Sequence, residues 1–313
     1  SGLGSTRHGT DTWQIRVSLT RGFGFDGSHD EMHGVDPLSG EVVDVPLHRH
    51  EVTVDIARIQ FQLEYTFEEP WAIRWRLPIE QKSRTSAIGS IDPATPEQIE
   101  QMERNLQIHH PSQTLMGFGD MEMLLSWHNH DMGKEGSLFS AAAGTTIPLG
   151  RTEENPYLAG DSGEEHEHIQ FGSGTFDPII EMFYSLPIGE ESSISAYAQG
   201  RFPGSRNDEG FRGSQSVQGG IGAITSLGDF GPGEQSFGVL GLLYQDLGRA
   251  TWDGLIDVNT GYQALSASIG ISWKDEEYRN RTLTLILPLS LETPYSSEGT
   301  YEPGPVLSFG IGF

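Results

Sequence analysis

The sequence of 313 residues contains no cysteine, and hydrophobic residues make up only 35% of it. Without cysteine the chain can form no disulfide, no thiolate metal site and no thiol nucleophile, which is compatible with an oxidising compartment. No run of about 18 apolar residues occurs, so the sequence predicts no transmembrane helix. A two-domain soluble enzyme of this length would carry more apolar residues for its core.

Basic residues are also scarce, with 19 Lys and Arg against 44 Asp and Glu, for a formal charge of −25. This balance excludes nucleic acid as a partner, because few cations are available to neutralise phosphates. Dense carboxylates suit a surface exposed to water rich in salt or divalent cations. The chain opens at SGLGSTRHGT without Met or an apolar leader. We therefore expect a mature form from which any signal peptide has been removed.

Sequence signals for catalysis are missing as well. There is no G-x-S-x-G elbow, no H-E-x-x-H and no P-loop. The histidine pairs at 128–130 and 166–168 have no recognisable serine partner. We therefore expect that the protein is not an enzyme and binds no organic cofactor.

What the chain does contain is apolar residues at every second position, the pattern of a β-strand. In the first such segment Trp13, Ile15, Val17 and Leu19 alternate with polar residues. One helix is predicted over 92–105, where proline and acidic residues mark a start. The pattern otherwise predicts an all-β chain of twelve strands, near 12–22, 50–66, 71–80, 117–128, 137–149, 175–187, 193–203, 214–227, 236–247, 262–274, 280–291 and 305–313.

The connections between these strands alternate between short and long. An even strand number, short turns on one side and long loops on the other are typical of an outer-membrane barrel. Such a barrel must close, because lipid cannot hydrogen-bond an open sheet edge. The long loops are predicted near 23–49, 81–116, 150–174, 204–213, 248–261 and 292–304.

The predicted fold is therefore a transmembrane antiparallel up-and-down β-barrel of about twelve strands, forming a single domain over 1–313. It has long extracellular loops, short periplasmic turns, and both termini in the periplasm of a bacterium, with 1–11 as an N-terminal periplasmic segment. A soluble β-sandwich or lipocalin-like barrel is the alternative. Soluble folds of that kind, however, do not systematically alternate long and short connections.

The last strand ends on an aromatic residue. Leu307, Phe309, Ile311 and Phe313 share one face, which we expect to contact lipid. The strand must also close on the first one, near 13–19. Phe309, Ile311 and Phe313 resemble the terminal signal by which the barrel-assembly machinery recognises outer-membrane barrels.

Three segments resemble a known family. They are GFGDMEMLLSW at 117–127, IPLGRTEE at 147–154 and GSGTFDP at 172–178. They are similar to outer-membrane transporters of the family named for the MetA pathway of phenol degradation. The resemblance is strongest over 117–190 and implies an outer-membrane channel or transporter. The acidic, histidine-bearing loop at 153–168 is longer than that family's pattern.

Charged residues are predicted inside the barrel. Alternation directs them away from the lipid face, and Arg and Glu on neighbouring strands lie close enough to pair. They either brace a narrow barrel or form a selectivity strip for charged and polar solutes. These candidates are Arg16, Arg58, Arg74, Arg76, Glu64, Glu122 and Glu181.

Histidines cluster at the outer end of the predicted barrel. Imidazole pairs bind Zn, Cu or Ni, and His48, His50, His166 and His168 are the candidate ligands. Loop histidines are also often only solvated. The oxygen-rich segments 26–31 and 160–165 are candidates for calcium, although neither has the EF-hand spacing.

The predicted function is an outer-membrane channel or transporter that passes small solutes through a narrow polar lumen. Two alternatives remain: a non-conducting scaffold for a partner protein or surface assembly, and a metal-ion uptake barrel that uses the external histidines and carboxylates. Expected partners are the lipid bilayer, the barrel-assembly machinery and a small-molecule solute.

Overall fold

A computed structural model describes most of the chain. The described residues are 12–161, 166–167, 169–228, 235–257, 260–274, 279–293 and 299–313. The predicted N-terminal segment 1–11, and His168 among the candidate metal ligands, lie outside them.

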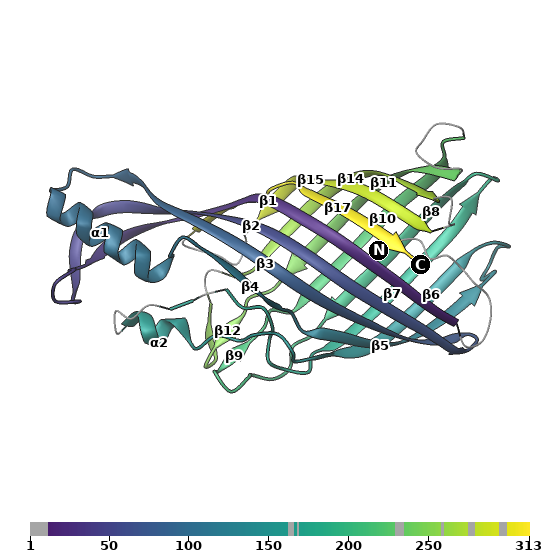
Figure 1. Ribbon diagram of the computed structural model, residues 1–313, viewed down its shortest axis with the longest axis horizontal. Coiled ribbons are helices and arrows are strands. Elements are labelled where there is room, and N and C mark those ends of the chain that lie inside the picture. Colours follow the sequence, from purple (N-terminus) through teal and green to yellow (C-terminus); the bar gives the residue numbers. More distant parts are fainter. Residues whose placement is uncertain are drawn as a thin grey trace.

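Twelve antiparallel wall segments, here called staves, form one closed sheet, as the sequence predicts (Figure 1). A stave is one strand or two strands in line. Two staves are interrupted, and each of these consists of two strands in line: β4 (Gln113–Phe118) with β5 (Met121–His130), and β16 (Gly299–Glu302) with β17 (Val306–Gly312). The other ten are β1 (Thr12–Val35), β2 (Val42–Glu68), β3 (Trp71–Ile91), β6 (Leu138–Ile147), β7 (Pro178–Ile188), β8 (Ser192–Arg201), β10 (Ser216–Ser226), β11 (Gln235–Leu247), β14 (Tyr262–Lys274) and β15 (Asn280–Glu292).

The last strand closes the barrel on the first. β17 pairs with β15 on one side and with β1 on the other, and Leu19 lies opposite Phe309. Beyond the strand, the Phe313 amide donates to the carbonyl of Ile15 at 2.8 Å. The predicted closure is confirmed, and it leaves the barrel wall without an open edge.

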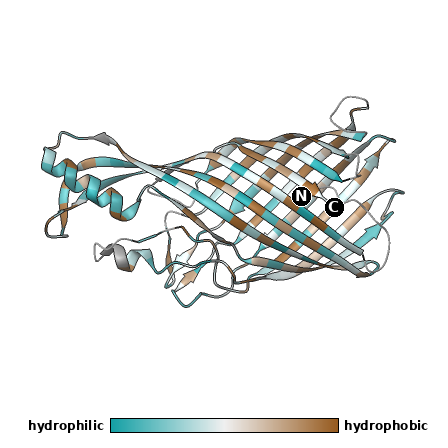
Figure 2. Cartoon of the chain, viewed as in Figure 1, coloured by the Kyte–Doolittle hydropathy of each residue, from teal (hydrophilic) through white to brown (hydrophobic). Residues whose placement is uncertain are grey.

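The two faces of the wall differ in polarity. Large apolar side chains stay exposed on the outside, among them Trp13, Ile221 and Leu240. Ser266 and Ser268 alternate with exposed Leu265 and Ile269, and brown and teal bands alternate along the strands in Figure 2. An exposed apolar outer band is the surface that a β-barrel presents to lipid. No helix among the described residues is long and apolar enough to cross a membrane.

The two ends of the barrel also differ. Short connections such as 69–70, 131–137 and 189–191 lie at one end, here called the turn end. β1 begins and β17 finishes there as well (Figure 1). The opposite, loop end carries helix α2 (Pro156–Asp161) and a small sheet of β9 (Phe211–Arg212), β12 (Thr251–Trp252) and β13 (Leu255–Ile256). These short elements lie within the loops predicted at 150–174, 204–213 and 248–261.

The bounds predicted for the loops at 23–49 and 81–116 are too wide, because the connections between strands span only 36–41 and 92–112. β1 continues to Val35, β2 starts at Val42, and only 36–41 connects them; β3 continues to Ile91. Together they project from the barrel as a narrow three-stranded sheet (Figure 1). These extensions have no lipid-facing side, so their polar sequence lacks the alternation on which the prediction relied. We call residues 29–50 and 85–110 the arm.

Helix α1 (Pro96–His109) belongs to the arm and overlaps the helix predicted at 92–105. It begins four residues later because Thr95 caps it: the Thr95 hydroxyl accepts from the Gln98 amide, and the Gln98 side chain accepts from the Thr95 amide. Met102 and Leu106 are buried where the helix packs on β1 and β2. The helix therefore packs on the arm, outside the barrel (Figure 1).

Candidate functional site

Ion pairs join neighbouring staves inside the barrel. Arg74 and Arg76 on β3 are two residues apart and therefore point to the same side of the sheet. Glu64 on β2 lies opposite Arg74, and Arg74 Nε donates to Glu64 Oε2 at 2.6 Å. Glu122 on β5 lies opposite Arg76, and the Arg76 Nη1–Glu122 Oε2 distance is 3.0 Å. The pairing predicted from alternation is present at these positions.

Glu181 connects more distant parts of the wall. It belongs to β7, which is separated from β3 by β5 and β6. Arg74 Nη1 nevertheless donates to Glu181 Oε2 at 3.1 Å, and Arg76 donates to Glu181 Oε1. These contacts pass over the inner faces of β5 and β6, and the charged side chains involved are only 11–22% exposed. We call Arg74, Arg76, Glu64, Glu122 and Glu181 the lumen bridge.

Other charged groups extend this polar interior. His128 Nε2 lies 3.7 Å from Glu64 Oε1, and the charge of Arg16 interacts with Arg74 and Glu64. Arg58 pairs with Glu80 at 2.5 Å, and Lys82 contacts the same carboxylate at 3.2 Å. Glu80, Lys82 and His128 were not among the lumen residues predicted from the sequence. Glu80 follows from the same alternation as the last residue of the predicted strand 71–80, and Lys82 follows once β3 is extended past that end.

The segments that carry the family resemblance meet at the loop end. The Gly150 amide donates to Asp120 Oδ1 at 3.1 Å, and the Ser173 amide donates to Asp120 Oδ2 at 2.7 Å. Arg201 at the end of β8 donates through Nη2 to Asp177 Oδ2 at 2.5 Å. Both carboxylates are almost wholly buried. The three motifs therefore form one polar knot that fixes the ends of the 150–174 segment to the wall.

Two glycines allow this knot to form. A Cβ on Gly150 would lie 2.5 Å from the Gly172 Cα, which is closer than real atoms approach. Any side chain at either position would push the two backbone segments apart and move Asp120 away from its donors. The glycines of these motifs are explained by packing, which makes the knot a structural element.

Histidines from separate segments gather in the arm. His48 Nε2 lies 3.2 Å from His50 Nε2, and the His50 ring lies 5.2 Å from that of His29 and 5.8 Å from that of His110. One nitrogen each of His29, His50 and His110 falls within 4.8 Å of the other two. The fold thus brings together β1, β2 and the residue that follows α1.

A second histidine pair adjoins this group. His109 Nδ1 lies 3.2 Å from His166 Nε2. Of the predicted metal ligands, the His48 and His50 side chains contact each other, whereas His166 contacts His109. Burial, followed by the charges of neighbouring histidines, lowers the pKa of His50 to about 3 and that of His109 to about 4. His29, His109 and His110 were not among the ligands predicted from the sequence.

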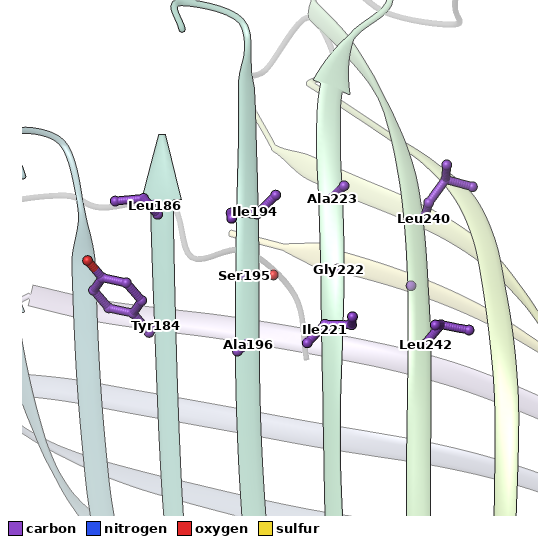
Figure 3. A pocket seen from close by; sticks show the side chains of 11 residues that line it. Tyr184, Leu186, Ile194, Ser195, Ala196, Ile221, Gly222, Ala223, Leu240 and Leu242 are labelled. Carbon is purple, nitrogen blue, oxygen red and sulfur yellow. The ribbon is translucent and has the colours of Figure 1, made fainter. Parts of the chain in front are cut away.

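A shallow apolar hollow lies on the outside of the barrel wall, between β7 and β11 (Figure 3). The small side chains of Ala196 and Ala223 create the hollow, and the exposed side chains of Ile194, Ile221 and Leu240 border it. The hollow belongs to the outer apolar band of the wall.

Comparison with known proteins gives information on the fold. No family model matches the chain, and no curated protein matches it in sequence. An outer-membrane channel from Pseudomonas putida F1 is similar in structure, with a TM-score of 0.61, 11% identity and coverage of 100% of both chains. A FadL homologue from Pseudomonas aeruginosa gives a TM-score of 0.47 at 7% identity over 97% of this chain and 90% of that one.

The similarity to the channel from Pseudomonas putida F1 concerns the fold. The chain has the barrel fold of an outer-membrane channel along its whole length. This agrees with the resemblance to the transporter family named for the MetA pathway, which also implies a barrel of this type.

Proposed function

We propose that the protein is a bacterial outer-membrane channel whose lumen bridge limits passage to small solutes. The observation that carries this proposal is the contact of Glu181 on β7 with Arg74 and Arg76 on β3, across the inside of a closed barrel. Charged side chains that cross a lumen reduce its free width and present both signs of charge to anything that passes.

The proposal extends to the solute and to orientation. A passage lined by paired Arg and Glu, with Ser266 and Ser268 on another part of the wall, favours small polar or charged solutes over apolar ones. The turn end faces the periplasm and the loop end, with the arm, faces outward, as in other barrels with short periplasmic turns. The protein then needs neither catalytic activity nor an organic cofactor.

Conductance in a planar lipid bilayer tests the proposal. Purified protein should produce discrete single-channel steps, and liposomes that contain it should admit small polar solutes while excluding those too large for a twelve-stranded barrel. Bilayers that remain sealed at high protein concentration, with liposomes that admit none of the solutes, would contradict a channel function.

The arm favours one alternative, a non-conducting scaffold. A three-stranded sheet with a helix on it projects beyond the barrel, which suits contact with a partner protein (Figure 1). Deleting the arm distinguishes the two functions. A channel limited by the lumen bridge should keep its conductance without residues 29–50 and 85–110, with β1–β3 rejoined by short turns, whereas a scaffold should show no conductance in either form.

A further inference from the structure

The histidine group in the arm has a geometry that the channel function does not use. We infer that His29, His50 and His110 form a binding site for a transition-metal dication such as Zn²⁺, Cu²⁺ or Ni²⁺. One ligand comes from β1, one from β2 and one from the residue that follows α1, so the site exists only in the folded arm.

Hydrogen bonds around His50 define which of its nitrogens carries a lone pair. His48 Nδ1 lies 3.1 Å from the carbonyl oxygen of Pro46, which can only accept, so this nitrogen carries the proton. The other nitrogen of a neutral His48 is then an acceptor, and it receives the Nε2 proton of His50 at 3.2 Å. In a neutral His50 this leaves Nδ1 without a proton and with its lone pair available.

That lone pair is buried and has no hydrogen-bond partner. The His50 side chain is 0% exposed, and its Nδ1 contacts no donor among the described residues. An unsatisfied buried acceptor costs about 1–3 kcal/mol, so such groups call for an explanation. A metal ion bound at Nδ1 supplies one. The hydrogen bonds that link the Pro46 carbonyl, His48 and His50 are also of the kind that orient a metal-binding histidine through its other ring nitrogen.

The positions of the other two rings suit a shared ion. A metal about 2.0–2.1 Å from each imidazole nitrogen brings those nitrogens to about 3.4 Å from one another in a tetrahedral site. The three nitrogens already lie within 4.8 Å, and His29 and His110 are half-buried, so rotation of their rings closes the difference. Three histidines leave a fourth position for water or another ligand.

The donor set defines the class of metal. Imidazole nitrogen suits Zn²⁺, Cu²⁺ and Ni²⁺, whereas Ca²⁺ and Mg²⁺ require oxygen ligands. Binding would fix the end of α1 to β1 and β2 and so make the arm rigid. This inference depends on the arm alone and holds whether or not the barrel conducts.

Metal titration of the purified protein tests the site. Protein treated with chelator and folded in detergent should bind one equivalent of Zn²⁺ by calorimetry, and elemental analysis should find it retained after gel filtration. A large excess of Ca²⁺ or Mg²⁺ should not displace it. Absence of a stoichiometric equivalent would overturn the inference.

Substitutions locate the bound ion. His29→Gln and His110→Gln remove half-buried ligands and should each weaken Zn²⁺ binding tenfold or more, while circular dichroism shows an unchanged fold. His48→Gln, which removes only the orienting contact, should weaken it about tenfold. His130→Ala, at the turn end, is the matched control and should bind as the parent does. Unchanged Zn²⁺ affinity in the His29 and His110 variants would place the metal elsewhere and refute the site.

A spectroscopic measurement is independent of affinity. Cu²⁺ bound at this site should show hyperfine splitting from several equivalent nitrogens in its electron paramagnetic resonance spectrum. Loss of one nitrogen in His29→Gln supports the assignment, and an unchanged spectrum contradicts it.

Discussion

Glu181 on β7 and Arg74 on β3 form an ion pair with an Nη1–Oε2 distance of 3.1 Å, although β5 and β6 lie between their strands. Arg76 donates to the other oxygen of the same carboxylate. One side chain therefore holds two cations from a strand three positions away around the wall. Its removal should alter both the width and the charge of the lumen.

Glu181→Gln should make the channel wider and more selective for anions. The substitution leaves Arg74 and Arg76 with one carboxylate each, Glu64 and Glu122, and removes the contact across the lumen. Single-channel conductance should rise, and the reversal potential in a salt gradient should shift toward that of the anion, with a severalfold change in permeability ratio. Glu41→Gln, in the exposed turn of the arm, carries the same charge change and should behave as the parent. Identical selectivity in all three proteins would exclude the lumen bridge as the selective element.

Asp177→Asn should destabilise the barrel at its loop end. Asp177 is 0% exposed and accepts from Arg201, Ser173 and Thr175. Loss of its charge leaves Arg201 with Asp120, at 3.3 Å, as its remaining carboxylate partner among the described residues, beside the Ser173 hydroxyl. We expect a cost of about 3 kcal/mol in the free energy of unfolding. Denaturant unfolding in detergent or lipid measures this cost. Exposed Asp208→Asn is the control, and an equal midpoint for the two variants would count against the knot.

Phe313→Ala, and more strongly deletion of 311–313, should reduce insertion into the outer membrane. The deletion removes the Val17–Ile311 and Arg16–Gly312 pairs together with the hydrogen bonds between Phe313 and Ile15, so the seam between β17 and β1 shortens. The amount of folded protein in isolated outer membranes measures the effect. Normal insertion of both variants would contradict an assembly role for these residues.

The metal-free arm should lose stability on acidification. His50 and His109 have folded-state pKa values of about 3 and about 4, below their ordinary value of 6.5. Between those values and pH 6.5 the unfolded arm binds more protons than the folded one, so stability is present above pH 6.5 and falls as the pH is lowered. The loss is up to about 1.4 kcal/mol per pH unit for each histidine.

Hydrogen exchange of the α1 amides, corrected for intrinsic rates, measures this change between pH 7 and pH 5. The double variant His50→Gln, His109→Gln should lose most of the pH dependence, while barrel amides remain protected in both proteins. Equal exchange of α1 at the two pH values would contradict the shifted pKa values.

The sequence predicted the features that depend on local alternation. The period of two along Trp13, Ile15, Val17 and Leu19 fixes which side chains face outward, because lipid tolerates only apolar groups there. The same alternation predicted that Arg74 and Arg76 face inward, toward carboxylates on adjacent strands. The signal was lost in the arm, where one face of the strands packs against α1 and the other meets water, and two strand extensions were therefore mistaken for loops.

By itself, then, the sequence determined a closed twelve-stranded barrel, the pairing of β17 with β1, and which charged side chains face inward. Each of these depends only on the alternation within a strand and on the strands that adjoin it. Only the tertiary structure decided which distant groups meet. The contact of Glu181 with Arg74 depends on the curvature of four staves, and the approach of His29 to His50 and His110 depends on how the arm folds. Spacing along a sequence carries no information on either distance, because both are set by the shape of the closed sheet and by the packing of α1 on it.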